Sequence, residues 1–405
     1  MDPIVIAVFV LVYAGMLLGE LPGLALDRTG IALLGAITLV ATDRVPVEAA
    51  WAAIDVGTIA LLFGLMVVSA QLRLGGFYTA VTRRMGSADH TPPRLLALVI
   101  LAAGGLSAFL ANDIVCLAMA PVLIEIAARR GLDPLPFLLA LAAAANVGSA
   151  ATLIGNPQNM LIGQARHLSF AGYLADGGVP AMAGLVIVWV VVAAAYRGRW
   201  TRVTPVPALP AQPYDAWQTG KGVAIAAGVV LAFLVTPWPR EAVALGAAGV
   251  LLANRRLASR EMLGLVDWPL LVLFAGLFVV NHALAASGAL EAVIDGLHAA
   301  GLRLREPATL FVSTAVLSNL VSNVPAVMLL LPASAHPSAG AVLALASTLA
   351  GNLVIVGSIA NLIVAEQAGR LGVVVDWRSH ARTGIPITLA TLALAAGWLA
   401  FVSGG

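Results

Sequence analysis

Residues 146–159 read NVGSAATLIGNPQN, and they interrupt an otherwise apolar stretch that runs from 135 to 165. The interruption itself, GNPQN at 155–159, places Asn156 directly before Pro157. Asn is favoured as a helix N-cap and Pro is favoured in the first helical turn. The pattern therefore predicts that a helix begins in the middle of an apolar stretch, where irregular backbone is tolerated only if it is buried in protein or lines a cavity.

Composition indicates that lipid surrounds most of the chain. Of its 405 residues, 60% are hydrophobic and 10% are charged, whereas a soluble domain has roughly 45–50% apolar and about 25% charged residues. The single cysteine, Cys116, excludes a disulfide framework and a multi-cysteine metal site. The sequence has no P-loop and no H-E-x-x-H motif, so ATP-driven and metalloprotease chemistry have no support. We therefore predict an all-α polytopic membrane protein.

The chain contains an internal repeat. The sequence LFGLMVV at 62–68 returns as FAGLFVV at 274–280. The offset between matching residues falls slowly and in one direction, as a duplication with small deletions predicts. Matching pairs are Gly64 and Gly276, Asn112 and Asn323, Asn146 and Asn352, Gly155 and Gly357, and Asn159 and Asn361. We assign 1–205 to a first membrane repeat, 206–220 to a cytoplasmic linker and 221–405 to a second membrane repeat.

Each half carries the same series of apolar segments: three plain helices, two stretches with a polar break, and a last helix. The predicted segments are 4–19, 30–42, 56–72, 94–128, 135–165 and 178–196, followed by 221–236, 241–253, 268–286, 307–336, 340–368 and 384–402. We interpret 94–128 and 307–336 as re-entrant hairpins. Each half then has about five transmembrane helices, one hairpin and one broken helix, and the odd number of crossings makes the second repeat inverted.

The basic residues support this topology. With the first hairpin returning to the side it entered from, 17 of the 22 Lys and Arg residues fall on one side of the membrane and 5 on the other. The side richer in Lys and Arg is expected to be cytoplasmic. We therefore predict a multi-pass protein of the inner (plasma) membrane with both termini outside the cytoplasm.

Broken helices at matching positions of two repeats are a pointer to a transporter's binding site. The hairpin tips read AND at 111–113 and SNV at 322–324. We expect Asn112 or Asp113 to cap the helix that follows the first tip. Helices that begin at the breaks present unpaired N–H groups and partial positive charge, so converging ends can bind an anion or polar solute without Lys or Arg. The predicted substrate-binding residues are Asn112, Asp113, Asn156, Gln158, Asn159, Ser322, Asn323, Ser358 and Asn361.

Two kinds of coupling ion fit these residues. Asn and Ser oxygens beside unwound carbonyls are hard ligands suited to Na⁺, and Ser107 with Asn112 and Ser318 with Asn323 repeat at near-equal spacing. Asp113 favours a proton or another cation as the coupling ion, because burying an acid at membrane depth costs free energy and such an acid is by default functional. The alternatives are that Asp113 is a plain N-cap, and that the Asn and Ser residues only tie helices together, at around 0.6 kcal/mol each.

The stretch 146–159 resembles a signature of the ion transporter superfamily, which contains citrate and dicarboxylate:sodium symporters, arsenite efflux permeases and sodium/proton antiporters. The resemblance covers nearly the whole chain, because the repeat plan matches too. It implies substrate contact by Asn112 and Asn323, and sodium coordination by Ser107, Ser318 and the loops around Gly155 and Gly357. It also implies a homodimer in which hairpins and broken helices slide as a transport part against a scaffold of the early helices.

The two tips depart from the sodium-coupled carboxylate branch, in which each tip reads Ser-Asn-Thr. Neither 111–113 nor 322–324 has the tip threonine, and Ala-Asn-Asp is more similar to the arsenite permeases. A buried Asp113 would also repel a dicarboxylate unless it were protonated or paired with a cation. Both observations favour proton coupling, or a neutral or weakly charged solute.

These observations lead to one main prediction. The chain is expected to be an ion-coupled secondary transporter of small anions or oxyanion-like solutes, with elevator-type alternating access. It is expected to use sodium or protons, to have no other cofactor, and to bind no nucleic acid. A sodium/proton antiporter is the alternative within the same class. A membrane enzyme or a scaffold without flux is the alternative from another class, although no enzymatic activity is predicted.

Overall fold

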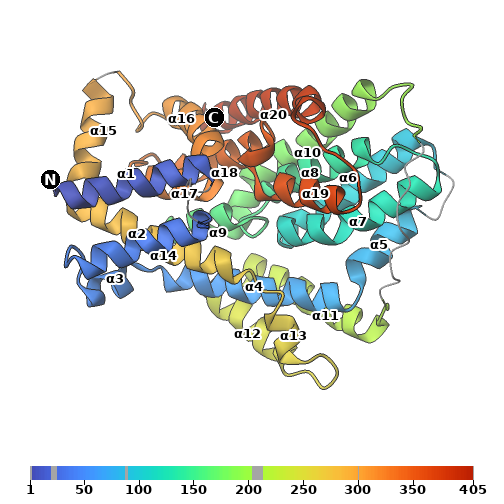
Figure 1. Cartoon of the computed structure of the whole chain (residues 1–405), viewed down its shortest axis with the longest axis horizontal. Coiled ribbons are helices and arrows are strands. Elements are labelled where there is room, and N and C mark those ends of the chain that lie inside the picture. The colour runs from blue at the N-terminus through green and yellow to red at the C-terminus, as the bar shows by residue number, and fades with distance from the viewer. Residues whose placement is uncertain (1, 20–24, 87–89, 203–212, 300, 405) are drawn as a thin grey trace.

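The structure, a computed structural model, describes residues 2–19, 25–86, 90–202, 213–299 and 301–404 (Figure 1). The first half has ten helices: α1 (Pro3–Leu18), α2 (Arg28–Ala41), α3 (Val47–Ala53), α4 (Val56–Leu74), α5 (Phe77–Gly86), α6 (Pro92–Phe109), α7 (Asn112–Arg129), α8 (Leu135–Ser149), α9 (Pro157–Ala165) and α10 (Phe170–Ala195). The second half has α11 (Ala216–Val235), α12 (Arg240–Leu252), α13 (Ser259–Leu263), α14 (Trp268–Ala286), α15 (Ala289–Ala299), α16 (Pro307–Val321), α17 (Asn323–Leu330), α18 (Ala339–Ala350), the 3-10 helix η1 (Ile355–Gly357), α19 (Ile359–Arg370) and α20 (Trp377–Gly404). The predicted all-α class is confirmed.

The two halves match helix for helix, and they are inverted. Each of α1 to α10 has a counterpart ten places later in the order. The counterparts α5 and α15 lie at opposite ends of the long axis of the molecule (Figure 1). The helices α3, α5, α13 and α15 were not predicted, because they are short and a search for long apolar runs does not detect them.

Six of the described helices are long and apolar enough to cross a membrane, namely α4, α6, α10, α11, α14 and α20. Shorter apolar helices include α1, α2, α8, α16 and α18. The predicted polytopic architecture, with full crossings beside shorter broken elements, is therefore confirmed.

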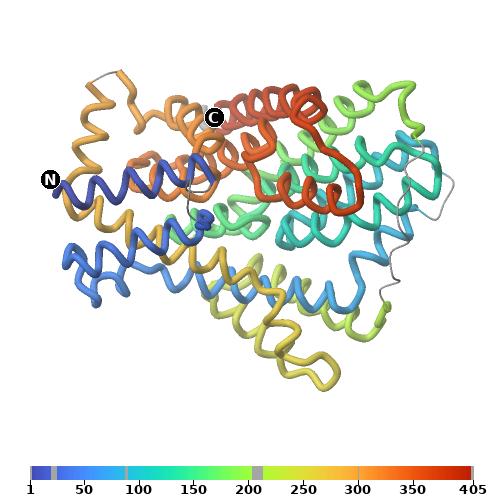
Figure 2. Tube along the Cα trace, viewed as in Figure 1, coloured from blue at the N-terminus to red at the C-terminus, as the bar shows by residue number. Residues whose placement is uncertain are grey.

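Two helix crossings join the repeats in a symmetric way (Figure 2). In the first, α4 packs on α12, and a Cβ added to Gly64 would lie 2.6 Å from the backbone carbonyl carbon of Ala244. In the second, α14 packs on α2, and a Cβ on Gly276 would lie 2.8 Å from the carbonyl carbon of Ala32. Small residues allow membrane helices to approach this closely, so the repeated glycine fixes the same crossing in both halves.

All four predicted breaks are present, but one expected cap is not. Asn156 accepts a hydrogen bond from the Asn159 N–H at 2.9 Å and caps α9, with Pro157 in the first turn, as predicted. The expected cap of α7 is wrong: neither Asn112 nor Asp113 caps it, because α7 begins at Asn112 itself and Ala111 occupies the N-cap position without a side-chain bond. The Asn112 N–H instead donates to the Gly155 carbonyl, which ties the hairpin tip to the neighbouring break.

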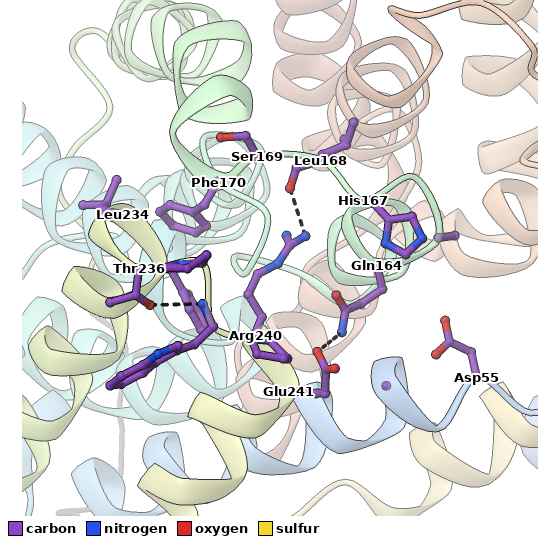
Figure 3. A pocket seen from close by; sticks show the side chains of 16 residues that line it. Asp55, Gln164, His167, Leu168, Ser169, Phe170, Leu234, Thr236, Arg240 and Glu241 are labelled. Carbon is purple, nitrogen blue, oxygen red and sulfur yellow. Dashed lines mark hydrogen bonds between the residues drawn. The ribbon is translucent and has the colours of Figure 1, made fainter.

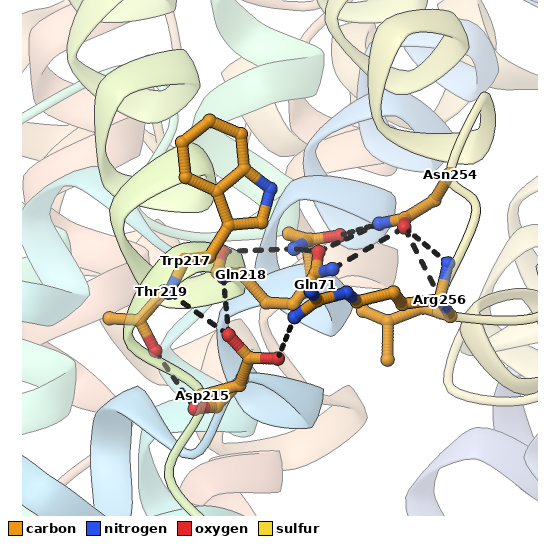
Figure 4. Close-up of polar contacts among 9 residues, drawn as sticks. Gln71, Asp215, Trp217, Gln218, Thr219, Asn254 and Arg256 are labelled. Atoms are coloured by element: carbon orange, nitrogen blue, oxygen red, sulfur yellow. Dashed lines mark hydrogen bonds and ion pairs between the residues drawn. The ribbon is translucent and has the colours of Figure 1, made fainter.

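The predicted linker, 206–220, extends too far at its C-terminal end. Residues 206–212 lie outside the described residues, and α11 begins at Ala216, inside the segment predicted as linker. Asp215 starts this helix by accepting hydrogen bonds from the N–H groups of Trp217 and Gln218. Buried Gln71 of α4 then donates to the Gln218 side chain at 2.9 Å, and Asn254 donates to the same side chain at 2.8 Å (Figure 4). These polar contacts hold the start of the second repeat against α4.

Candidate functional site

The two repeats meet at a buried pair of matching asparagines. Asn146 of α8 donates from Nδ2 to the Oδ1 of its own counterpart, Asn352, at 2.8 Å, and to Asn361 Oδ1 at 3.3 Å. Its oxygen accepts from Ser358 Oγ at 2.8 Å and from Asn112 Nδ2 at 3.4 Å. A bond between counterparts places the pseudo-twofold axis of the repeat here. One side chain thus connects the first hairpin tip with the second broken helix.

The first broken helix is joined to α18 of the other repeat through one hydroxyl group. Thr348 Oγ1 accepts hydrogen bonds from Asn156 Nδ2 and from Gln158 Nε2, each at 3.2 Å, and donates to Asn159 Oδ1 at 3.3 Å. Asn159 Nδ2 also donates to the Thr152 carbonyl at 2.9 Å. All of these side chains are buried, and buried polar groups that are fully paired make a rigid cluster.

The second hairpin tip is closed by hydrogen bonds. In the amide orientation that satisfies both of its ends, Asn323 Nδ2 lies 3.1 Å from the Ser347 and Gly357 carbonyls and 2.5 Å from Ser318 Oγ. In the same orientation its Oδ1 accepts from Gln158 Nε2 at 3.2 Å. The predicted pair Ser318 and Asn323 is therefore brought together, and the asparagine oxygen is already used by a protein donor.

The tip residue Ser322 adopts a strained backbone conformation. Its φ of 77° with ψ of 162° belongs to a region that is almost confined to glycine. Non-glycine residues in such regions cost on the order of 1–3 kcal/mol and cluster at functional sites. The second tip is therefore held in a conformation that its own sequence disfavours.

The first hairpin differs from the second in the hydrogen bonds of its polar side chains. Ser107 Oγ and Asn112 Oδ1 are buried, and neither has a hydrogen-bond partner among the described residues. A Cβ added to Gly155 would lie 2.4 Å from the Ser149 carbonyl oxygen and 2.7 Å from the Ser107 carbonyl oxygen, so only glycine fits beside them. Unpaired buried oxygens are costly, and here they gather where the sequence predicts a cation site. The described residues contain no cluster of three or more His, Cys, Asp or Glu side chains that could hold a metal ion.

Asp113 lies at a cavity between the hairpin and the early helices. The cavity has a volume of about 250 Å³, and the first turns of α7 and α9 both line it, through Ala111 and Asp113 and through Pro157 and Met160. Asp113 is half-buried, and its carboxylate makes no hydrogen bond or ion pair with the described residues. Two helix N-termini and one free carboxylate therefore face the same space.

The opposite wall of this cavity comes from α4 and the start of α14. It includes Arg73 and Asp267. Asp267 caps α14 through the Leu270 N–H, whereas the half-buried side chain of Arg73 makes no hydrogen bond or ion pair with the described residues. Sequence reasoning selected neither residue for the site, because both lie outside the breaks.

A second, larger hollow of about 740 Å³ lies at the other end of α4, between α9 and α12 (Figure 3). Arg240 projects into it from the first turn of α12 and donates to the carbonyls of Gly163 and Leu168, each at 2.9 Å. Beside it, Gln164 Nε2 donates to Glu241 Oε2 at 2.8 Å. The end of α9 is thus fastened to α12 at this point.

The structure brings most of the predicted site residues into one buried cluster. Hydrogen bonds connect Asn112, Asn156, Gln158, Asn159, Ser318, Asn323, Ser358 and Asn361, with Gly357 contributing a carbonyl. Asp113 lies apart at the cavity, and Ser322 enters none of these bonds. Sequence reasoning missed Thr348, although its position in an apolar run beside the second break was a usable signal.

Known proteins resemble this chain over nearly its whole length. Residues 8–350 match the family model described as citrate transporter. The silicon efflux transporter LSI3 of Oryza sativa subsp. japonica is 29% identical over 459 residues, covering 93% of each protein. An uncharacterized transporter of Mycobacterium tuberculosis is 30% identical over 428 residues, covering 98% of each. The inner membrane protein YbiR of Escherichia coli is 32% identical over 330 residues, covering 81% of this chain and 84% of YbiR.

One solved structure has the same fold. The crystal structure of the YdaH transporter of Alcanivorax borkumensis, described as having an unusual topology, superposes with a TM-score of 0.60. The alignment covers 98% of this chain and 97% of YdaH at 15% sequence identity. At that identity the likeness concerns the fold alone.

Proposed function

The chain belongs to the citrate transporter family, and we propose that it is an ion-coupled secondary transporter of small oxyanion-forming solutes. It is a multi-pass membrane transporter of the plasma membrane, since its relatives are transporters and YbiR is an inner membrane protein. The proposed mechanism is elevator-type alternating access. In it, α6 to α10 and α16 to α20 form the transport part, and α1, α2, α4, α11, α12 and α14 form the scaffold.

The observation that carries this proposal is the cavity at Asp113. The starts of α7 and α9 line the cavity, so the partial positive charge of two helix N-termini lies beside it. The Asp113 carboxylate offers a hydrogen-bond acceptor on the same wall. A solute that fits must therefore tolerate the positive ends of two helices and donate hydroxyl hydrogens to the carboxylate.

Small hydroxylated weak acids meet both requirements with little negative charge, whereas citrate has a hydroxyl group but also three carboxylates. A multiply charged carboxylate would be repelled by an ionised Asp113. The silicon efflux transporter among the relatives agrees with a hydroxylated weak acid as solute. Arsenite and silicic acid are the first solutes to test.

We propose that the coupling ion is a proton and that it binds at Asp113. An acid at membrane depth is expected to have a transport role, and this one has no protein partner that would neutralise it. Sodium at Ser107 and Asn112 is the second candidate, because both oxygens are buried and unpaired. Sodium at Ser318 and Asn323 has less support, because the Asn323 oxygen is already bonded to Gln158.

Thermal unfolding of the purified protein tests solute and coupling together. The panel contains arsenite, silicic acid, citrate, sulfate and phosphate, each in Na⁺ and in choline, at two pH values. A ligand present at 100 times its dissociation constant adds about 2.7 kcal/mol of stability. We expect arsenite or silicic acid to stabilise the protein in a pH-dependent way, and Asp113→Asn to remove the pH dependence. Asp295→Asn is the matched control, since this acid is exposed on α15.

Two other results would change the proposal. Stabilisation by citrate that requires Na⁺ would replace it with sodium-coupled carboxylate transport. Stabilisation by Na⁺ or by pH alone, with no effect of any solute, would replace it with a sodium/proton antiporter. Uptake or efflux in proteoliposomes then measures flux for whichever solute binds.

A further inference from the structure

The fastening of α9 to α12 joins the proposed transport part to the proposed scaffold. Arg240, at the first position of α12, donates to two carbonyls at the end of α9, those of Gly163 and Leu168. Glu241 accepts from Gln164 at 2.8 Å. Hydrogen bonds from a charged guanidinium are stronger than neutral ones. These contacts hold the end of α9 against the scaffold, and Figure 3 shows those between Arg240 and Leu168 and between Gln164 and Glu241.

The first repeat also has an arginine at the start of a scaffold helix, and the second repeat also has a broken transport helix. The counterparts of Arg240 and Glu241 are Arg28 and Thr29, which begin α2. The counterpart of α9 is α19, whose last turns carry Glu366 at the position that matches Gln164. The chain thus has a second arginine at the start of a scaffold helix, α2, and a second transport helix, α19, whose end corresponds to that of α9.

These counterparts make no hydrogen bond or ion pair with one another in the part of the chain that the structure describes. Arg28 donates to the Met16 carbonyl of α1 at 3.2 Å, and Thr29 donates to the Pro269 carbonyl of α14. The exposed Glu366 pairs instead with Arg370 of its own helix. Among the described residues, no hydrogen bond or ion pair joins α2 to α19.

The Asp113 cavity lies at the end of the scaffold where the contact is missing. Thr29 bonds to Pro269, which follows the cavity residue Asp267 by two positions, so Arg28 and the cavity share one end of the scaffold. Gly57 lies beside Glu241 and Gln164 at the other end. The contact between transport part and scaffold is therefore formed at the α9 end and missing at the α19 end.

Buried hydrogen bonds join the elements around α9 and α19 into one body. Asn156 and Gln158 bind Thr348 of α18, and Asn361 of α19 binds Asn146 of α8. A shift of this body toward Arg28 carries α9 away from Arg240. Inverted repeats place one set of contacts at each end of such a movement.

We propose that Arg240 and Arg28 are alternating latches, one for each end state of the transport cycle. In the state described here, Arg240 holds the end of α9 against α12. In the opposite state, Arg28 leaves Met16 and binds the end of α19, with Glu366 as its acidic partner. This inference rests on the proposed transport function, since it assigns the contacts that stabilise each of its two states.

Paired cysteines in the full-length protein test the exchange. In a Cys116→Ser background, one variant carries Gln164→Cys with Glu241→Cys and another carries Thr29→Cys with Glu366→Cys. A short thiol cross-linker is applied in proteoliposomes. We expect both pairs to cross-link, although only the first pair is in contact here. Adding Arg240→Ala should lower the ratio of the first product to the second about tenfold, and Arg28→Ala should raise it by a similar factor.

Arg303→Ala is the matched control, because this arginine is exposed and pairs only with Glu306 three residues away. It should leave the ratio unchanged. The inference is overturned if the second pair never cross-links, or if Arg240→Ala and Arg28→Ala move the ratio in the same direction. Solute flux of the cysteine-free protein is measured in parallel. Flux without cross-linking of the second pair rejects the latches alone, whereas cross-linking of both pairs without flux of any solute rejects the transport function.

Discussion

At the scale of single residues, Arg73 is the basic side chain that lines the Asp113 cavity. The side chain is half-buried and makes no hydrogen bond or ion pair with the described residues, so it is available to the charged form of an oxyanion. We expect Arg73→Gln to weaken solute binding by about 1.5–3 kcal/mol, which is the usual contribution of a hydrogen bond to a charged group. Titration of the thermal shift with solute measures the loss.

Arg94→Gln controls for this change, because Arg94 is exposed at the start of α6 and lines no part of that cavity. Its binding should match that of the unchanged protein. If Arg73→Gln binds solute equally well, Arg73 only extends its charge toward water along the cavity wall.

Sequence reasoning found the amides of the site but not its opposite wall. Asn156 and Asn323 stand at breaks in apolar runs, and that local signal is sufficient to select them. Arg73 and Asp267 stand at the ends of ordinary helices, and only the packing of α4 and α14 against the first hairpin brings them to Asp113. The absent cap at Asn112 has a similar cause, because its side chain bonds to Asn146 on another helix.

At the scale of helices, the crossing of α4 and α12 depends on Gly64. A Cβ at this position would lie 2.6 Å from the Ala244 carbonyl carbon, so a side chain must push the two helices apart. We expect Gly64→Val to lower the free energy of unfolding by about 1–3 kcal/mol, the usual cost of overpacking. Gly246→Ala on α12 should instead be neutral or stabilise by up to about 1 kcal/mol, since nothing lies within 4 Å of the added methyl.

Denaturant unfolding in detergent compares these two variants with the unchanged protein. Equal stability of Gly64→Val and Gly246→Ala would show that the helices can separate without loss. The sequence indicated Gly64 and Gly276 as a repeated pair, but it could not show that each faces the other repeat. That information is in the pairing of α4 with α12 and of α14 with α2.

At the scale of the whole molecule, the repeat followed from the sequence because two long segments match in order, and its inversion was predicted from the odd number of crossings in each half. The sequence did not predict which repeat would have its arginine bound to the transport part. Both repeats have an arginine at the matching helix start, and the two repeats differ in the contacts that this arginine makes. Only the structure shows Arg240 engaged and Arg28 held by Met16. The asymmetry of the two hairpin tips, bonded at Ser318 and unpaired at Ser107, is likewise absent from the two similar sequences.

The orientation of the molecule predicts which face of the membrane the Asp113 cavity serves. Leu265 lines this cavity at the end where α13 meets α14, and Trp238 lies at the opposite hollow, 65% exposed. If the side rich in Lys and Arg is cytoplasmic, Leu265→Cys in a Cys116→Ser background should react with a membrane-impermeant thiol reagent in inside-out vesicles only. Trp238→Cys should react in right-side-out vesicles only. The reverse pattern would place the open cavity outside the cell, and the state described here would then be the one that exchanges solute with the exterior.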